Sequence, residues 1–182
     1  MHASACARST AAVLAAALLT APAWAAAPAG VAAVWAPRRV HFVYQGFTTR
    51  YSCDGLRDEI VALLSRLQAR DLKVREEPCS TGAGVPDPFP GVTVTMQVLV
   101  PAAPGTAGAV SAHWRKVVLT RGDDYGQGGK CELIEQFRHS FLPLFSARTV
   151  RLQATCVPHQ ITPGTYLSAE VLLPDRPGSG HR

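Results

Sequence analysis

The sequence lacks an apolar run long enough to cross a membrane. Its candidate run, residues 11–19, has about nine residues, whereas a membrane-spanning helix needs roughly twenty. The run follows His2 and Arg8 and precedes Pro-Ala-Trp-Ala at residues 22–25, which ends in an Ala-x-Ala pattern. We therefore expect residues 1–25 to be a secretory signal peptide cleaved near Ala25, and the mature chain to be periplasmic or secreted without a transmembrane segment.

Motifs of several enzyme classes are also missing. No G-x-S-x-G surrounds a serine, so a serine-hydrolase elbow is not visible. Residues 122–130 end in Gly-Lys and are followed by Cys131, but they lack the first glycine of a phosphate loop, and Cys131 stands where its Ser/Thr is required. Tyr125 and Gln127 interrupt the calcium-loop pattern. We interpret this stretch as a strand-to-helix connection, with a recognition loop as the alternative. No cofactor is expected.

The histidines show no metal-binding spacing. His41, His113, His139 and His159 are far apart in the sequence, and no two are three or four residues apart. Carboxylates occur as sequence neighbours, but a catalytic pair needs facing positions in a cleft. The sequence therefore predicts no metal site and identifies no catalytic residue.

Cysteine is scarce. Of the five cysteines, Cys6 is lost with the expected signal peptide, which leaves Cys53, Cys79, Cys131 and Cys156. The absence of C-x-x-C gives no support to disulfide exchange, and the absence of paired close spacings argues against a zinc site. An even number of cysteines in an exported chain predicts structural disulfides.

The chain has a small excess of positive charge. Cleavage near Ala25 would remove one of the 18 basic residues and none of the 13 acidic ones, so the formal net charge would fall from +5 to +4. This charge permits attraction to an anionic polymer or a membrane surface but is too small to identify either.

Two segments of the chain resemble each other. Cys53 and Ala69 are sixteen positions apart, as are Cys131 and Ala147, and both stretches have apolar residues at helical spacing. Pro143 should end or kink the second helix. The apolar positions of the two expected helices are Leu56, Ile60, Leu63, Leu64 and Leu67, and Ile134, Phe137, Phe141, Leu142 and Phe145.

Alternating residues predict three strands around each helix. The resulting order, β-α-β-β twice, predicts an internally duplicated α+β fold with two helices on one face of a mostly antiparallel sheet, or of two three-stranded units side by side. The expected segments are a flexible lead-in (26–39), a first repeat (40–100), a second repeat (112–173) and a disordered tail (174–182), with residues 40–173 forming one compact domain and residues 80–91 a long loop.

The repeat selects one of the three pairings of four cysteines. A helix of about fifteen residues and a returning strand of eight or nine have similar lengths, roughly 22 and 26 Å, so each repeat should bring its own two cysteines together. We therefore predict the disulfides Cys53–Cys79 and Cys131–Cys156. The first repeat has one more residue before its second cysteine, and we expect a bulge or bend at residues 76–78 to compensate.

Basic residues are expected on the polar face of the sheet. Lys73, Arg75, Arg151 and one of Arg115 or Lys116 could bind an anionic polymer there. The alternative is a solvated face with positive charge for solubility, which the lack of interleaved aromatic residues favours. The same lack leaves no strong signal for nucleic-acid binding.

Three functional hypotheses follow. The first is a non-catalytic binding module that recognises an unknown protein or an anionic component of the cell envelope through its sheet face, a strand edge or its long loops, including Asp123 and Asp124. The second is a cell-envelope hydrolase whose site is assembled between the repeats from the histidines and these two aspartates. The third is a structural or assembly subunit that pairs through the edge of the strand at residues 92–100.

Overall fold

The computed structural model describes residues 30–120, 130–160 and 164–175. Two helices pack on a six-stranded sheet, which confirms the predicted α+β class, and each half of the chain has the element order β-α-β-β. The elements are β1 (Val31–Val43), α1 (Cys53–Arg66), β2 (Arg70–Glu76) and β3 (Gly91–Pro101), followed by β4 (Val110–Thr120), α2 (Cys131–Ser140), the 3-10 helix η1 (Leu142–Leu144), β5 (Ala147–Gln153) and β6 (Tyr166–Pro174).

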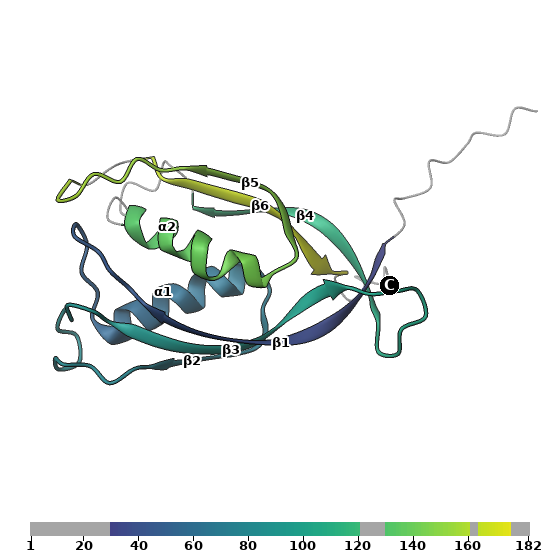
Figure 1. Cartoon of the computed structure of the whole chain (residues 1–182), viewed down its shortest axis with the longest axis horizontal. Helices are drawn as coiled ribbons and strands as arrows, with labels where there is room; N and C mark the ends of the chain where they lie inside the picture. The colour runs from purple at the N-terminus through teal and green to yellow at the C-terminus, as the bar shows by residue number, and fades with distance from the viewer. Residues whose placement is uncertain (1–29, 121–129, 161–163, 176–182) are drawn as a thin grey trace, which may run out of the picture.

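The sheet is antiparallel throughout and has two arms. Its strand order is β2-β3-β1-β4-β6-β5. β1 and β4 pair through three residue pairs, from Val31 with Ala112 to Ala33 with Val110, and this short junction joins the arms. Figure 1 shows the arms diverging from the junction with α1 and α2 between them. The helices therefore cover the inner face of both arms, and the outer faces point away from each other.

The main core combines both halves. Phe42 of β1 contacts Phe141, which follows α2, edge to face at 5.1 Å between ring centroids, and Phe141 stacks on Phe137 at 5.0 Å. Every predicted apolar position is buried, which agrees with the predicted face of each helix, but Phe141, Leu142 and Phe145 lie beyond the end of α2. Buried in this core are Leu56, Ile60, Leu63, Leu64, Leu67, Ile134, Phe137, Phe141, Leu142 and Phe145.

The helix ends follow local sequence signals. The Ser52 side chain accepts a hydrogen bond from the backbone N–H of Gly55 at 3.2 Å and caps α1. α2 ends at Ser140, and the chain continues as a 3-10 turn that contains Pro143. The expected termination of the second helix is thus confirmed, because proline cannot donate the backbone hydrogen bond that continuation requires.

The flexible lead-in predicted at residues 26–39 is wrong from Val31 onward. Residues 31–39 are the first nine residues of β1, which ends at Val43. The backbone nitrogens of even-numbered residues in β1 face β3, as the bond from Tyr44 N–H to the Pro90 carbonyl shows. The Pro37 nitrogen therefore faces the other edge, which is unpaired beyond Ala33, and its missing N–H removes no ladder bond.

The prediction of a bulge or bend at residues 76–78 is wrong as regards a bulge at Glu76 or Glu77. Pairing with β3 continues through Glu76, and the Glu77 N–H donates to the Gly91 carbonyl at 2.9 Å. The register shift lies instead at Asp71, which has a φ of 50°, and a matching shift lies at Thr149 of β5, with a φ of 51°. β2 and β5 are the two edge strands, and bulges there interrupt the surface available for further strand pairing.

The cysteines pair within each half. Cys53 is bonded to Cys79 and Cys131 to Cys156, with Cα–Cα separations of 6.4 and 5.5 Å, as the sequence predicts. Two disulfides are compatible with an oxidising compartment. None of the helices in the described ranges has the length and apolar character of a membrane span. Two predictions fall outside the described residues: the expected signal peptide, and a binding role for Asp123 and Asp124. Pro174, expected in the tail, is instead the last residue of β6.

Candidate functional site

The outer face of the first arm carries a polar trough. Cross-strand pairing aligns Arg39 of β1 with Thr95 of β3 and Lys73 of β2, and the next outward-facing row consists of His41, Thr93 and Arg75. Since neighbouring strands lie about 4.8 Å apart, Arg39 and Lys73 flank Thr95 with backbones about 10 Å apart. We define the basic trough by Arg39, Lys73, Arg75, Thr93, Thr95 and Gln97.

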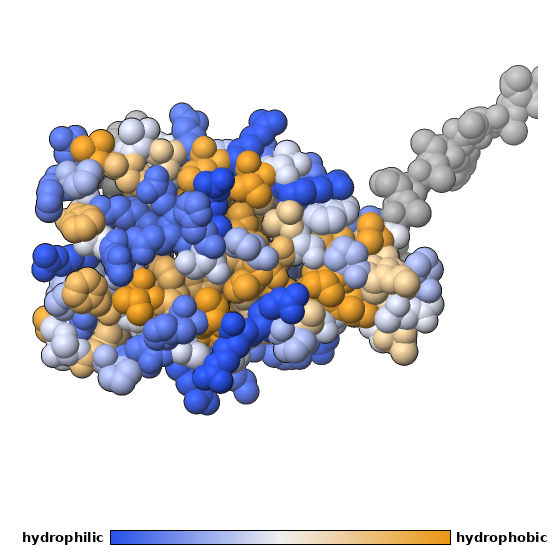
Figure 2. Space-filling model, viewed as in Figure 1, coloured by the Kyte–Doolittle hydropathy of each residue, from blue (hydrophilic) through white to orange (hydrophobic). Residues whose placement is uncertain are grey.

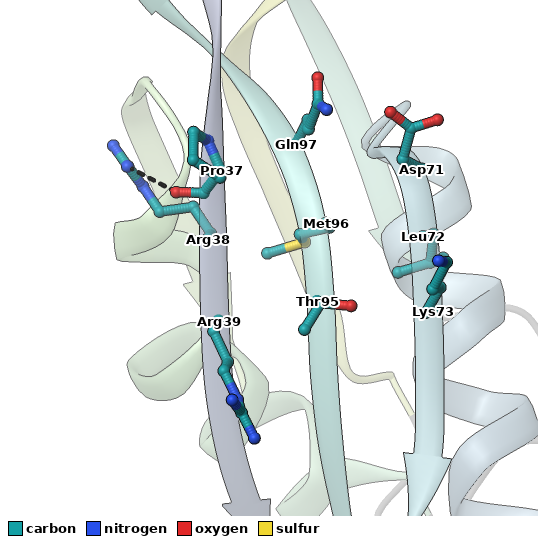
Figure 3. Close-up of a pocket in the computed structure, with 9 residues that line it drawn as sticks. All are labelled: Pro37, Arg38, Arg39, Asp71, Leu72, Lys73, Thr95, Met96 and Gln97. Carbon is teal, nitrogen blue, oxygen red and sulfur yellow. Dashed lines mark hydrogen bonds between the residues drawn. The ribbon is translucent and has the colours of Figure 1, made fainter.

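The trough is elongated along the strands. Two depressions, of about 680 and 440 Å³, share Arg39, Lys73 and Thr95, so they adjoin one another. Figure 3 shows Thr95 on the middle strand between Arg39 and Lys73, with Gln97 farther along the same strand. In Figure 2, strongly hydrophilic residues gather along the lower edge of the molecule, over the arm that contains β1, β2 and β3. This shape suits a chain-like ligand better than a compact one.

The trough's cations are available to a ligand. Arg39, Lys73 and Arg75 form no ion pair within 4.0 Å in the part of the chain that the structure describes. Three carboxylates also line the two depressions, against four cations when Arg38 is included. Glu76 binds Arg57 at 2.5 Å, Glu77 contacts Thr93 and His41, and Asp71 lies 4.0 Å from Arg70. The hydrogen bond from Thr93, followed by His41 and the charge of Arg39, lowers the pKa of Glu77. The trough therefore has more positive than negative charge.

The predicted basic residues are divided between the two arms. Lys73 and Arg75 lie together in the basic trough, whereas Arg151 lines a small depression on the other arm with Lys116. The structure also distinguishes Lys116 from Arg115, because the Arg115 Nη2 donates to the Pro174 carbonyl at 2.8 Å. A single basic face containing all these residues is therefore not present.

Sequence reasoning missed Arg39. The residue was assigned to the lead-in because the alternation of apolar and polar residues begins at Val40. Only the pairing of β1 with β3 shows that Arg39 faces outward beside Thr95. The one signal in the sequence was its position directly before Val40, where the alternation of the predicted strand begins.

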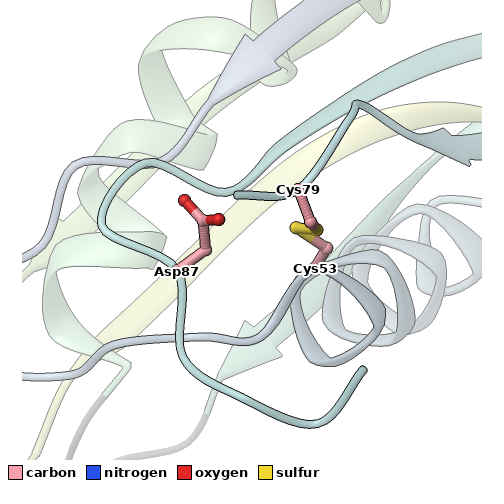
Figure 4. A group of neighbouring side chains, drawn as sticks. All are labelled: Cys53, Cys79 and Asp87. Carbon is pink, nitrogen blue, oxygen red and sulfur yellow. A yellow bond between two sulfur atoms is a disulfide. The ribbon is translucent and has the colours of Figure 1, made fainter. Parts of the chain in front are cut away.

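A group of potential metal ligands has a structural role instead. The sulfur atoms of Cys53 and Cys79 and a carboxylate oxygen of Asp87 lie within 4.8 Å of one another (Figure 4). Both sulfurs are in the disulfide, so neither is available as a thiolate ligand. Asp87 accepts hydrogen bonds from the Ser80 hydroxyl at 2.6 Å and from the Phe89 N–H at 2.9 Å, which lower its pKa and fix the loop before β3.

The four histidines occupy separate places and share no partner among the residues described. His41 contacts Glu77, and His113 Nε2 lies 3.0 Å from Asp175. His139 lines an apolar pocket of about 360 Å³ beside η1, and the ring of His159 lies 6.4 Å from that of Phe47. These positions do not bring the histidines together as one hydrolase site.

His113 has a serine nearby but not the arrangement of a catalytic triad. Ser111 Oγ and the His113 ring both approach Gly30 closely. Asp175, however, occupies Nε2 of His113, which is the nitrogen that accepts the serine proton in the usual triad. The described residues around this histidine therefore give no support to serine hydrolysis.

Glu132 in the first turn of α2 connects the two halves. Its carboxylate accepts hydrogen bonds from the N–H groups of Phe47 and Thr48, at 3.0 and 3.1 Å, and from the Tyr44 hydroxyl at 3.2 Å. Burial opposes ionisation, but these hydrogen bonds outweigh it and lower the pKa of Glu132. The loop after β1 is thereby held on α2.

Replacing Glu132 with glutamine should lower the free energy of unfolding by about 1–2 kcal/mol at neutral pH, because an amide provides one acceptor oxygen instead of two charged ones. The folded pKa is lowered, so this contribution is present above the unfolded pKa of about 4.3 and is lost as the pH falls through the lower folded value. Urea unfolding across this range measures it. Glu135→Gln on the same helix is the control, and equal losses in both variants would contradict the assignment.

No family model, curated protein or solved structure matches this chain. Its function has to be inferred from its own residues.

Proposed function

We propose that the protein is an exported, non-catalytic module that binds an extended anionic glycan of the cell envelope along the basic trough. The observation that carries this proposal is the alignment of Arg39, Lys73 and Arg75, without ion-pair partners among the described residues, along an elongated polar depression. The expected signal peptide and the two disulfides support export.

The lining of the trough favours a glycan over other anionic ligands. Small-molecule sites are enclosed, whereas this depression is open and has threonine and glutamine along its floor. Single-stranded nucleic acids need aromatic platforms for their bases, and none of the residues lining the trough is aromatic. Hydroxyl and amide side chains beside cations suit a chain that carries both hydroxyl and anionic groups.

The alternative of assembly through residues 92–100 does not fit the observed topology. β3 lies between β2 and β1; β1 pairs along nearly all of it, and β2 pairs with its residues 92–97. The edge strands β2 and β5 both contain a bulge, and the other open edges are those of β1 and β4 beyond their short junction. A hydrolase remains the second proposal only through Asp123 and Asp124, which lie outside the described residues.

Lys73→Gln combined with Arg75→Gln should weaken binding to heparin, a sulfated glycan used as the probe, by about tenfold or more at physiological salt. The slope of log affinity against log salt concentration should fall by about one to two, because two fewer counterions are displaced. Isothermal titration at several salt concentrations provides both quantities.

The matched control is Arg50→Gln combined with Arg138→Gln. It removes the same net charge from two cations that have no ion pair among the described residues and do not line the trough. The control should change the affinity by no more than about threefold. If both double variants lost affinity equally, net charge rather than the trough would determine binding; if heparin did not bind the parent protein at all, the proposal would fail.

A further inference from the structure

The second arm has a small depression at the position that corresponds to the basic trough. Arg151 of β5 pairs with Ser168 of β6, as Lys73 pairs with Thr95 in the first arm. On the other side of β6, Lys116 of β4 pairs with Glu170. The depression has a volume of about 130 Å³ and is lined by Lys116, Thr149, Arg151, Ser168, Ala169 and Glu170.

Two cations in this depression lack a carboxylate partner. Glu170, the acidic residue of the lining, is bound to Arg148 at 2.8 Å and also accepts a hydrogen bond from Thr149 at 3.3 Å. Lys116 and Arg151 form no ion pair within the described ranges. The negative charge at the site is therefore compensated by Arg148, and the charge of the other two cations is available to a ligand.

Hydroxyl groups accompany these cations. Ser168 of β6 is opposite Arg151, lies two residues before Glu170, the partner of Lys116, and is 1% exposed. Tyr166 lies two residues earlier on the same face of β6, where hydrogen bonds with Ser168 and then Lys116, together with the charge of Arg151, lower the pKa of its phenol. The pKa of Tyr166 therefore depends on the charges beside the depression.

The size of the depression limits its ligand. A volume of about 130 Å³ is well below the roughly 300–1,000 Å³ of pockets that hold drug-sized ligands, so it suits a single tetrahedral oxyanion rather than a polymer segment. Arginine and lysine beside hydroxyl donors match the several acceptor oxygens of a sulfate or phosphate group. The small volume and the positive charge of the depression both favour a single oxyanion as its ligand.

We propose that Lys116, Arg151 and Ser168 form a second binding site, specific for one sulfate or phosphate group. This site is independent of the basic trough, because it lies on the outer face of the other arm and uses none of the same residues. The group could be a free ion or one carried on a larger molecule, and the two sources share the chemistry that the site recognises.

The test is a titration with inorganic sulfate and, separately, inorganic phosphate, at constant ionic strength maintained with sodium chloride. The ring resonances of Tyr166, identified by their loss in Tyr166→Phe, report on the site in NMR spectra. Saturation should shift these resonances and raise the pKa of Tyr166, because a bound anion opposes formation of the phenolate. Lys116→Gln and Arg151→Gln should each weaken binding by about tenfold.

Three comparisons make the result decisive. Lys73→Gln combined with Arg75→Gln should leave the sulfate response unchanged, which separates this site from the trough. Arg151→Lys should retain part of the affinity and guards against loss of folding. A sulfated monosaccharide that competes with inorganic sulfate would support a carried group, whereas binding of the free ions alone would assign the site to them. A Tyr166 response no larger than that to chloride, or one that persists in Lys116→Gln and Arg151→Gln, would overturn the proposal.

Discussion

Replacing both Cys131 and Cys156 with alanine is expected to lower the free energy of unfolding by about 3.5 kcal/mol. The disulfide closes a loop with a sequence separation of 25 residues, and its loss increases the conformational entropy of the unfolded chain. The disulfide also connects the first turn of α2 to the segment after β5. Its loss should therefore loosen mainly the second half of the chain.

Urea unfolding of the oxidised parent and the double variant provides the measurement. A second double variant, Cys53→Ala with Cys79→Ala, opens a loop with a sequence separation of 26 residues. It should lower the free energy of unfolding by a similar amount. Reductant should destabilise the parent more than either double variant, since each variant has only one disulfide left. Equal unfolding midpoints for the parent and both double variants, all measured under oxidising conditions, would rule out a stabilising role.

Phe141→Ala is expected to cost about 3–5 kcal/mol. The side chain is fully buried, and its ring contacts both Phe42 of the first half and Phe137 of α2. Truncation therefore leaves a cavity where the two halves meet and removes two aromatic contacts.

Phe47→Ala is the matched control, because the Phe47 side chain is 67% exposed. It should change the free energy of unfolding by no more than about 0.5 kcal/mol. Chemical denaturation of both variants gives the comparison. A cost below about 1 kcal/mol for Phe141→Ala would show that the core adjusts to fill the space and that this contact between the halves contributes little.

The helices and disulfides could be predicted because their signals are local. Leu56, Ile60 and Leu63 repeat at the period of one helix face, and all three are buried. The match between helix and strand length then placed each pair of cysteines together. The similar geometry of the two halves agrees with a duplicated unit, although duplication itself stays a prediction.

The sheet details could not be obtained in the same way, because they depend on partners distant in the sequence. The start of β1 at Val31 is determined by pairing with β3 and β4, since Ala and Pro residues obscure its alternation. The bulges at Asp71 and Thr149 use a positive φ at residues other than glycine, which composition does not indicate. The same applies to the candidate site. The sequence predicts Lys73 and Arg75 on the polar face of the sheet, but their alignment with Arg39 depends on how β1 and β2 pair with β3.

The order of the cysteine pairs has a consequence for biosynthesis. Each native disulfide joins cysteines that are consecutive among the described four, so a chain entering an oxidising compartment N-terminus first can close Cys53–Cys79 before Cys131 arrives. Among these four cysteines, the partner available at each stage is then the native one, which reduces the need for correction by slow disulfide exchange. Delivery from the N-terminus therefore favours the native pairing of these four cysteines.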